Sequence, residues 1–158
     1  MRPRGFGIVE VVVGMAIISA SFVALTGIAR FSLNVIDQAN LNLRAVFLLS
    51  EGIEAVHLNR DESWTNKIAP LSNGTAYYLS YSSGRWSVTA TPQPNIDGVF
   101  TRTVTLYEVR RDGSDNIVAS GGSVDSKTRK VTARATWSYL GRSYDESVSA
   151  YITDLFSN

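Results

Sequence analysis

The chain has 158 residues, of which 44% are hydrophobic and 18% are charged, and its formal net charge is +1. No run of basic residues is longer than two, so the sequence lacks the basic face or tail typical of nucleic-acid binding, and we expect no nucleic-acid partner. The lack of cysteine excludes disulfides and thiolate metal sites, and the single histidine, His57, leaves too few groups for a zinc centre or a catalytic triad. We therefore expect no enzymatic activity, no cofactor and no metal site.

An uncharged apolar segment dominates the N-terminal part of the chain. Residues 11–29 contain no charge, and the apolar flank extends back to Phe6. Because about 20 apolar residues cross a bilayer core as a helix, this segment predicts one membrane-spanning helix followed by one small domain. Arg2 and Arg4 precede it, so the positive-inside rule places the N-terminus in the cytoplasm and the remaining domain across the membrane.

Glu10 is the residue that a plain membrane anchor does not explain. An ionised carboxylate within an apolar stretch costs about 2.5–3.5 kcal/mol on insertion scales. A positive charge that meets it inside the membrane would account for it. Two other interpretations stay open: Glu10 is a hydrated residue at the cytosolic interface of a signal anchor, or a secretory cleavage after Ala20 or Ala29 removes it.

The first residues resemble the type IV pilin superfamily, which includes the pseudopilins of type II secretion. The matching motif is a short basic leader that ends in Gly5, with Phe6 and Glu10 as the first and fifth residues after it. The resemblance implies cleavage between Gly5 and Phe6 by a prepilin peptidase, N-methylation of Phe6, and pairing of Glu10 with the N-terminal ammonium of a neighbouring subunit. Where many members carry a helix-kinking proline this chain has Gly27, which puts a sharp kink in doubt.

This resemblance gives the expected organisation of the chain. It comprises a leader (1–5), a transmembrane and polymerisation helix (6–30), the periplasmic half of the same helix (31–60) and a β-rich globular head (61–158). We expect the subunit to cross the inner membrane once and then to enter a filament in the periplasm or at the cell surface. The partners implied are a prepilin peptidase, other pilin or pseudopilin subunits and an inner-membrane assembly platform.

Beyond the membrane segment the sequence continues as an amphipathic helix. The spacing of its apolar residues predicts one packing stripe, made of Ile36, Ala39, Leu43, Val46, Leu49, Ile53 and Val56. No proline interrupts the chain from Phe6 to Lys67, so one helix is expected from Phe6 to about Asn59. The segment from Ala45 to Asn59 resembles minor pilins of the V type and pseudopilins of the I type, which implies a minor subunit.

The residues after Asp61 read as short β-strands separated by turns. The expected strands are Thr75–Ser82, Arg85–Ala90, Thr101–Val109, Lys130–Leu140 and a last strand through Ile152, with turns at Ser83-Gly84 and Gly141-Arg142. In the fourth strand one face is apolar and comprises Val131, Ala133, Ala135, Trp137 and Tyr139. The sequence therefore predicts an α+β fold, in which a long N-terminal helix packs against a four- or five-stranded antiparallel sheet.

Several other segments have the residue types of a site. Residues 112–116 place oxygen ligands at alternate positions, as a calcium loop does, but glycine comes too early and position 123 is serine, so a turn is expected. Asn73-Gly74-Thr75 is likewise expected to be a turn. His57 is expected to face solvent near the helix end, and Asp61 and Glu62 to form a solvated helix exit. The chain has three tryptophans, Trp64, Trp86 and Trp137. We expect two of them to lie in the core.

These observations favour a structural subunit, of the minor class, of a type IV pilus or a type II secretion pseudopilus. The alternative is a membrane-anchored extracytoplasmic binding module that does not polymerise, in which Glu10 would be dispensable and Gly5 would not precede a cleavage site. An anchored hydrolase is disfavoured, because the sequence has one histidine and no recognisable nucleophile motif.

Overall fold

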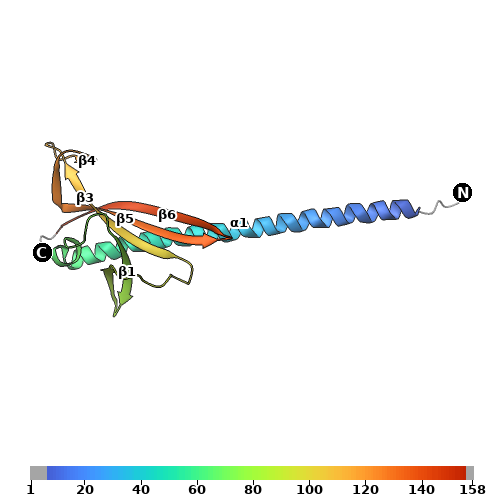
Figure 1. Cartoon of the computed structure of the whole chain (residues 1–158), viewed down its shortest axis with the longest axis horizontal. Coiled ribbons are helices and arrows are strands. Elements are labelled where there is room, and N and C mark those ends of the chain that lie inside the picture. Colours follow the sequence, from blue (N-terminus) through green and yellow to red (C-terminus); the bar gives the residue numbers. More distant parts are fainter. Residues whose placement is uncertain (1–6, 156–158) are drawn as a thin grey trace. The chain divides into compact units, whose positions relative to one another are not determined.

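The computed structural model describes residues 7–155 and contains a long helix and a six-stranded antiparallel sheet (Figure 1). This arrangement confirms the predicted α+β fold. The elements in chain order are α1 (Ile8–Glu62), the π-helical turn η1 (Trp64–Ile68), β1 (Ala76–Ser82), β2 (Arg85–Thr89), β3 (Thr101–Arg111), β4 (Ile117–Val118), β5 (Ser123–Tyr139) and β6 (Arg142–Thr153).

The chain forms two compact units, residues 1–41 and 42–158, and α1 contributes to both of them. The helix continues without a break through Gly14 and Gly27. It ends at Glu62, three residues beyond the predicted Asn59, because Ser63 adopts an extended backbone with φ −169° and ψ 115°. The Ser63 hydroxyl then accepts a hydrogen bond from the Asn66 amide at 3.2 Å, which caps η1.

Five strands of the sheet follow the spatial order β2-β1-β3-β5-β6, and β4 pairs with the far end of β3. Both predicted tight turns occur, with left-handed backbone conformations at Ser83-Gly84 and at Leu140-Gly141. The second lies one residue before the predicted Gly141-Arg142, because Arg142 already pairs with Tyr139. β5 begins seven residues before the predicted Lys130, because residues 123–125 pair with the end of β3. The short strand β4 was not foreseen from the sequence.

The register between β3 and β5 shifts at one point. Glu108 pairs with Arg129, but the next residue, Val109, pairs with Asp125, so β5 carries extra residues at this point. A bulge of this kind bends the strand that carries it. We call residues 109–125, which contain the end of β3, β4 and the start of β5, the arm; Figure 1 shows it turning away from the rest of the sheet.

The core of residues 42–158 lies between the last turns of α1 and one face of the sheet. From the sheet it contains Val104, Leu106, Val131, Ala133, Ala135 and Trp137, which confirms the predicted face of β5, although Tyr139 is only half-buried. The opposite face of the sheet carries the alternate residues of the same strands. We call it the outer face.

The predicted helix stripe is wrong in its composition. Of its members in this unit, Leu49 and Val56 are buried, whereas Leu43 and Val46 are more than half exposed. Half of the residues on the buried side of α1 are instead small, namely Ala45, Gly52 and Ala55, and the others are Leu49, Val56 and Asn59. Small side chains let the helix approach the sheet closely, since a Cβ atom added at Gly52 would lie 3.3 Å from the Cβ of Ala133.

Candidate functional site

The first turn of α1 contains the acidic residue that the sequence singles out. Glu10 is the third residue of the helix, and its Oε2 accepts a hydrogen bond from the Gly7 backbone N–H at 2.9 Å. This is the reciprocal half of a capping box, in which a glutamate in the first turn satisfies an N–H that has no partner within the helix. A negative charge at this end also interacts favourably with the helix dipole.

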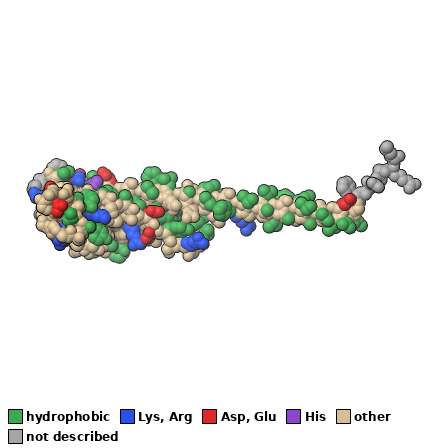
Figure 2. Space-filling model, turned by 90° about the horizontal axis from the view of Figure 1, so that it is seen from above, with side chains coloured by type: hydrophobic (Ala, Val, Ile, Leu, Met, Phe, Trp, Pro, Cys, Tyr) green, Lys and Arg blue, Asp and Glu red, His purple; other side chains and the backbone are tan. Residues whose placement is uncertain are grey.

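The helix that follows Glu10 exposes its apolar side chains on all sides. Every large apolar side chain from Ile8 to Ile36 is between 46% and 84% exposed. Figure 2 shows hydrophobic side chains along the whole helical segment beside the grey terminal residues. α1 is long and apolar enough to cross a membrane. Such a surface must be covered either by lipid or by other protein.

Gly5 and Phe6, at which cleavage and N-methylation are predicted, lie outside the described residues. Glu10 can nevertheless be analysed by itself. Within the described residues its carboxylate accepts one hydrogen bond, through Oε2. An ionised carboxylate that leaves water loses hydration free energy of roughly several kcal/mol. One hydrogen bond from a neutral amide does not offset this loss. In a low-dielectric layer Glu10 therefore still requires a positive partner.

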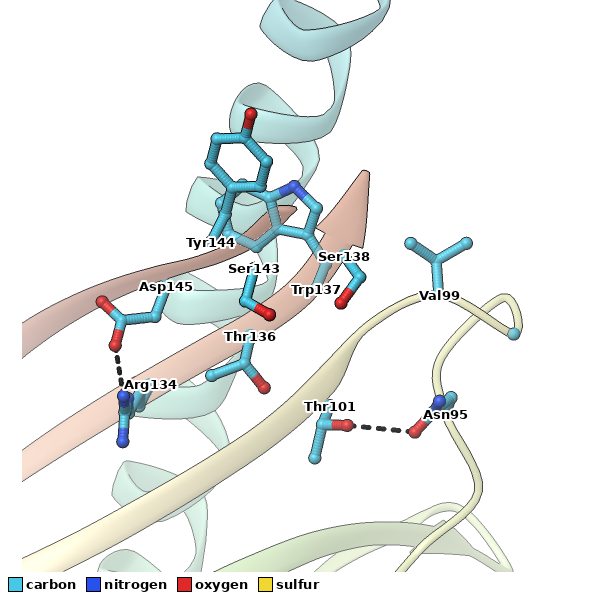
Figure 3. A pocket seen from close by; sticks show the side chains of 11 residues that line it. Asn95, Val99, Thr101, Arg134, Thr136, Trp137, Ser138, Ser143, Tyr144 and Asp145 are labelled. Atoms are coloured by element: carbon cyan, nitrogen blue, oxygen red, sulfur yellow. Dashed lines mark hydrogen bonds and ion pairs between the residues drawn. The ribbon is translucent and has the colours of Figure 1, made fainter. Parts of the chain in front are cut away.

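A second candidate is an open pocket of about 610 Å³ on the outer face of the sheet. Figure 3 shows hydroxyl groups gathered between the β5–β6 strands and the loop at residues 95–101. The hydroxyls come from Thr101, Thr136, Ser138 and Ser143. Thr101 donates to Asn95 Oδ1 at 3.0 Å, and Arg134 forms an ion pair with Asp145 across the floor.

The loop that borders this pocket is held against α1. Arg44 forms an ion pair with Asp97, which has a left-handed backbone with φ 52°, and the Arg44 guanidinium lies 5.4 Å from the ring centre of the buried Phe100. Beside the loop, the Trp137 and Tyr144 rings stack with their centres 5.6 Å apart. The pocket is thus bordered by a loop tied to α1, and its lining combines neutral hydroxyl groups with the Arg134–Asp145 ion pair.

The chemistry of this pocket is that of a binding site for a polar ligand. Four hydroxyls line it, but the only histidine of the chain, His57, lies on α1 and approaches Glu54 at 3.8 Å. His57 is therefore not placed to activate these hydroxyls, and the one carboxylate among the described lining residues, that of Asp145, is held in an ion pair with Arg134. Sequence reasoning missed this pocket. Its signal was the alternation of serine and threonine on β3, β5 and β6, which was interpreted only as the solvent side of a sheet.

The segment at residues 112–116 forms the predicted turn. Asp112 Oδ1 accepts hydrogen bonds from the backbone N–H groups of Ser114 and Asn116, each at 2.9 Å. These bonds, with one from the Asn116 side chain, lower the pKa of Asp112. The carboxylate is therefore used by its own turn. Within residues 7–155 no group of three or more His, Cys, Asp or Glu side chains could hold a metal ion.

The remaining candidates lie apart from one another. Asp61 pairs with Arg60 at 2.7 Å, whereas Glu62 lies 3.4 Å from Arg85, so the two carboxylates have separate partners. His57 is about one-third exposed. As predicted, two tryptophans, Trp64 and Trp137, are buried and the third, Trp86, is half-buried.

Asn73 and Gly74 form the predicted turn, and Asn73 Oδ1 accepts a hydrogen bond from the Glu108 backbone N–H at 2.9 Å. This bond ties the turn before β1 to the end of β3.

No protein-family model matches the chain, and neither a curated protein nor a solved structure matches it. Its function is therefore inferred from its own residues and their geometry.

Proposed function

We propose that this chain is a structural subunit, of the minor class, of a type IV pilus or a type II secretion pseudopilus. The observation that carries the proposal is a single carboxylate, Glu10, in the first turn of a helix whose other side chains as far as Ala29 are uncharged. The large apolar side chains of this helix from Ile8 to Ile36 are all exposed. The assignment to the minor class rests on the resemblance of residues 45–59.

Processing would supply the positive partner that Glu10 lacks. Hydrolysis of the peptide bond between Gly5 and Phe6 leaves an ammonium group on Phe6, and methylation of that nitrogen keeps its positive charge. The hydrogen bond from Gly7 turns the Glu10 carboxylate back toward the start of the helix, which is the end where this ammonium group forms. Mutual neutralisation between neighbouring subunits would then favour one axial register of the packed helices.

Helix packing would supply the rest of the assembly energy. When an assembly platform extracts the subunit from the bilayer, the apolar side chains of residues 8–36 lose their lipid cover. Helices of other subunits can replace the lipid, because packing between apolar helices does not depend on water being excluded.

The proposal is tested by co-expression with a prepilin peptidase and the assembly machinery. We expect Gly5→Ala to stay unprocessed, and Glu10→Ala to be processed but to enter filaments at least about a hundredfold less, since loss of one partner of a buried ion pair costs about 3–5 kcal/mol. Glu10→Gln, which keeps the shape and removes the charge, is expected to fail in the same way. The measurements are the N-terminal mass and the amount of subunit in sheared filaments.

Asp37→Ala provides a matched control, because it removes an acid from the same helix outside the apolar run. We expect this variant to assemble normally. If Glu10→Ala assembles as well as Asp37→Ala, the proposal is wrong.

The hydroxyl-lined pocket supports a second candidate, a membrane-anchored binding module that does not polymerise. This candidate uses α1 only as an anchor and the outer face of the sheet as the ligand-binding surface. It requires that Gly5→Ala and Glu10→Ala both leave location and ligand binding unchanged, so the same two variants distinguish the candidates.

A further inference from the structure

A groove separate from the hydroxyl-lined pocket lies where the arm meets the outer face of the sheet. It has a volume of about 620 Å³. Its floor is formed by Tyr107, Lys130 and Tyr151, and its wall by Ile117, Val118 and Ala119 of the arm. We call it the arm groove.

An ion pair between Asp125 and Arg111 lies at the bulge, beside the arm groove. Asp125 accepts a hydrogen bond from Arg111 Nε at 2.8 Å and another from the Lys127 backbone N–H at 2.9 Å. Arg111 also donates to the Asp115 carbonyl at 2.9 Å, within the turn at the tip of the arm. Hydrogen bonds from both sides therefore hold the arm at one angle to the sheet.

The floor is a regular row across three neighbouring strands. Tyr107 on β3 pairs with Lys130 on β5, which pairs with Tyr151 on β6. Since neighbouring strands lie about 4.8 Å apart, the two tyrosines are separated by about 10 Å, with the lysine between them. Tyr107 is 42% exposed and Tyr151 is 53% exposed, so both rings can be contacted from solution.

The charges of the arm groove favour a ligand of moderate negative charge. Lys130 forms no ion pair within residues 7–155. Arg110 donates to the Gly122 carbonyl, and Glu108 lies 3.8 Å from Arg129. The lining thus has two cations and one anion. A densely charged polyanion such as nucleic acid would need a larger basic surplus and would meet the Glu108 carboxylate.

The shape of the arm groove disfavours a peptide partner. A peptide strand binds along a free sheet edge through its backbone, but this groove lies over a sheet face and presents side chains. A peptide helix needs a continuous apolar groove, and here polar groups interrupt the lining. Exposed rings spaced along a flat floor, with single polar groups between them, suit a chain of sugar rings, whose apolar faces stack on tyrosine and whose substituents accept hydrogen bonds.

We propose that the arm groove binds an extended acidic oligosaccharide. Two sugar rings stack on Tyr107 and Tyr151, and a carboxylate of the sugar between them pairs with Lys130. The Asn73 amide, whose oxygen already accepts a bond from Glu108, borders the same groove and directs its nitrogen to a sugar oxygen. This inference does not depend on polymerisation, because the groove is built entirely within residues 73–151.

The test uses the full-length chain in nanodiscs of neutral phosphatidylcholine, with hexagalacturonate as the probe in isothermal titration calorimetry. We expect Tyr107→Ala, Tyr151→Ala and Lys130→Gln each to weaken binding about tenfold, which corresponds to loss of one central contact. Tyr107→Phe and Lys130→Arg keep the ring and the charge, so they are expected to bind within about threefold of the unchanged chain.

Matched controls separate a local effect from a general one. Tyr81→Ala removes a tyrosine on β1 that is 62% exposed, more than either groove tyrosine, and Lys67→Gln removes a lysine on η1; both should leave affinity unchanged. Cellohexaose, which lacks the carboxylates, should bind at least about tenfold more weakly. The proposal is overturned if hexagalacturonate does not bind, if the groove variants bind as the controls do, or if hexaglutamate or a thymidine hexanucleotide binds as tightly.

Discussion

At the scale of single residues, the observed capping role of Glu10 does not compete with the role that we propose for it in assembly. Its hydrogen bond from Gly7 caps the first turn of α1 within one chain. The negative charge itself remains, because a backbone amide does not neutralise it. A carboxylate accepts several hydrogen bonds, so it can keep the Gly7 bond while it binds an ammonium group. Local capping thus orients the charge that the proposed assembly uses.

Asp125 is the residue at which folding is expected to depend on acid. Hydrogen bonds from Thr128 and Arg111 lower its pKa to about 2, below the value of about 3.9 in an unfolded chain. A lowered folded-state pKa stabilises the fold above pH 4, and this stabilisation is lost as pH falls from about 4 to 2. We expect Asp125→Asn to lower the free energy of unfolding at pH 7 by up to about 2 kcal/mol and to flatten this acid dependence.

The measurement is urea unfolding at several pH values, followed by tryptophan fluorescence. Asp115→Asn is the control, since Asp115 is more exposed and lies farther from Arg111, at 3.6 Å. Equal acid dependence in Asp125→Asn and the unchanged chain would contradict the role given to Asp125.

Gly52 is expected to be intolerant of large side chains. A Cβ atom there would already lie 3.3 Å from Ala133 and 3.4 Å from Arg102. Gly52→Leu must push the helix from the sheet, and we expect a loss of about 3 kcal/mol or more. Ser50→Leu, on the exposed side of the same turn, should change stability by less than about 0.5 kcal/mol. A Gly52→Leu variant as stable as Ser50→Leu would show that the helix does not pack as described.

At the scale of elements, one buried side chain joins α1 to the sheet. Arg102 on β3 is 4% exposed at its side chain, forms an ion pair with Glu51, and donates to the Leu48 carbonyl at 3.3 Å. Its guanidinium also lies 5.2 Å from the ring centre of Trp86 on β2. Helix, central strand and edge hairpin therefore meet at this residue.

Replacement of Arg102 separates packing from charge. We expect Arg102→Ala to destabilise by about 2–4 kcal/mol, because it leaves a cavity between helix and sheet. Arg102→Met fills most of that volume, and the Glu51 carboxylate that loses its partner is about half exposed and stays hydrated, so a change within about 1 kcal/mol is expected. Urea unfolding measures both. If Arg102→Met is as damaging as Arg102→Ala, the ion pair rather than the packing holds the elements together.

Sequence patterns predicted the elements better than their contacts. The apolar period of two placed Val131, Ala133 and Ala135 on the core face correctly, because burial on one side of a strand leaves a direct signal. The helix stripe was misplaced, because Gly52 and Ala45 pack through their smallness and not through hydrophobicity. Leu43 and Val46, the more apolar choices, face away from the sheet.

The arm and its groove could not be predicted, for a related reason. They depend on a register shift between Glu108 and Val109, and register follows from pairing between strands that are distant in sequence. Tyr107, Lys130 and Tyr151 become neighbours only through that pairing. In contrast, Glu10 was found from sequence alone, because a charge within an apolar run needs no tertiary contact to be conspicuous.

At the scale of the whole molecule, the surfaces of the two compact units suit different surroundings. Residues 1–41 contain the exposed apolar helix, which requires lipid or protein around it, whereas residues 42–158 enclose their own core and carry a polar outer face. The proposed function assigns anchoring and assembly to the first unit, and the arm groove proposed to bind an oligosaccharide lies in the second. Variants of the head should therefore alter ligand binding without altering processing.

The central claim is that Glu10 serves as counter-ion to an amine created by cleavage, and the intact mass of the membrane-purified chain tests its premise most directly. Co-expressed with a prepilin peptidase, the chain should lack Met1 to Gly5 and carry one added methyl group at Phe6. A Gly5→Ala variant should keep its full length under the same conditions. A mature chain that still begins at Met1, or one cut after Ala20 or Ala29, would contradict the account.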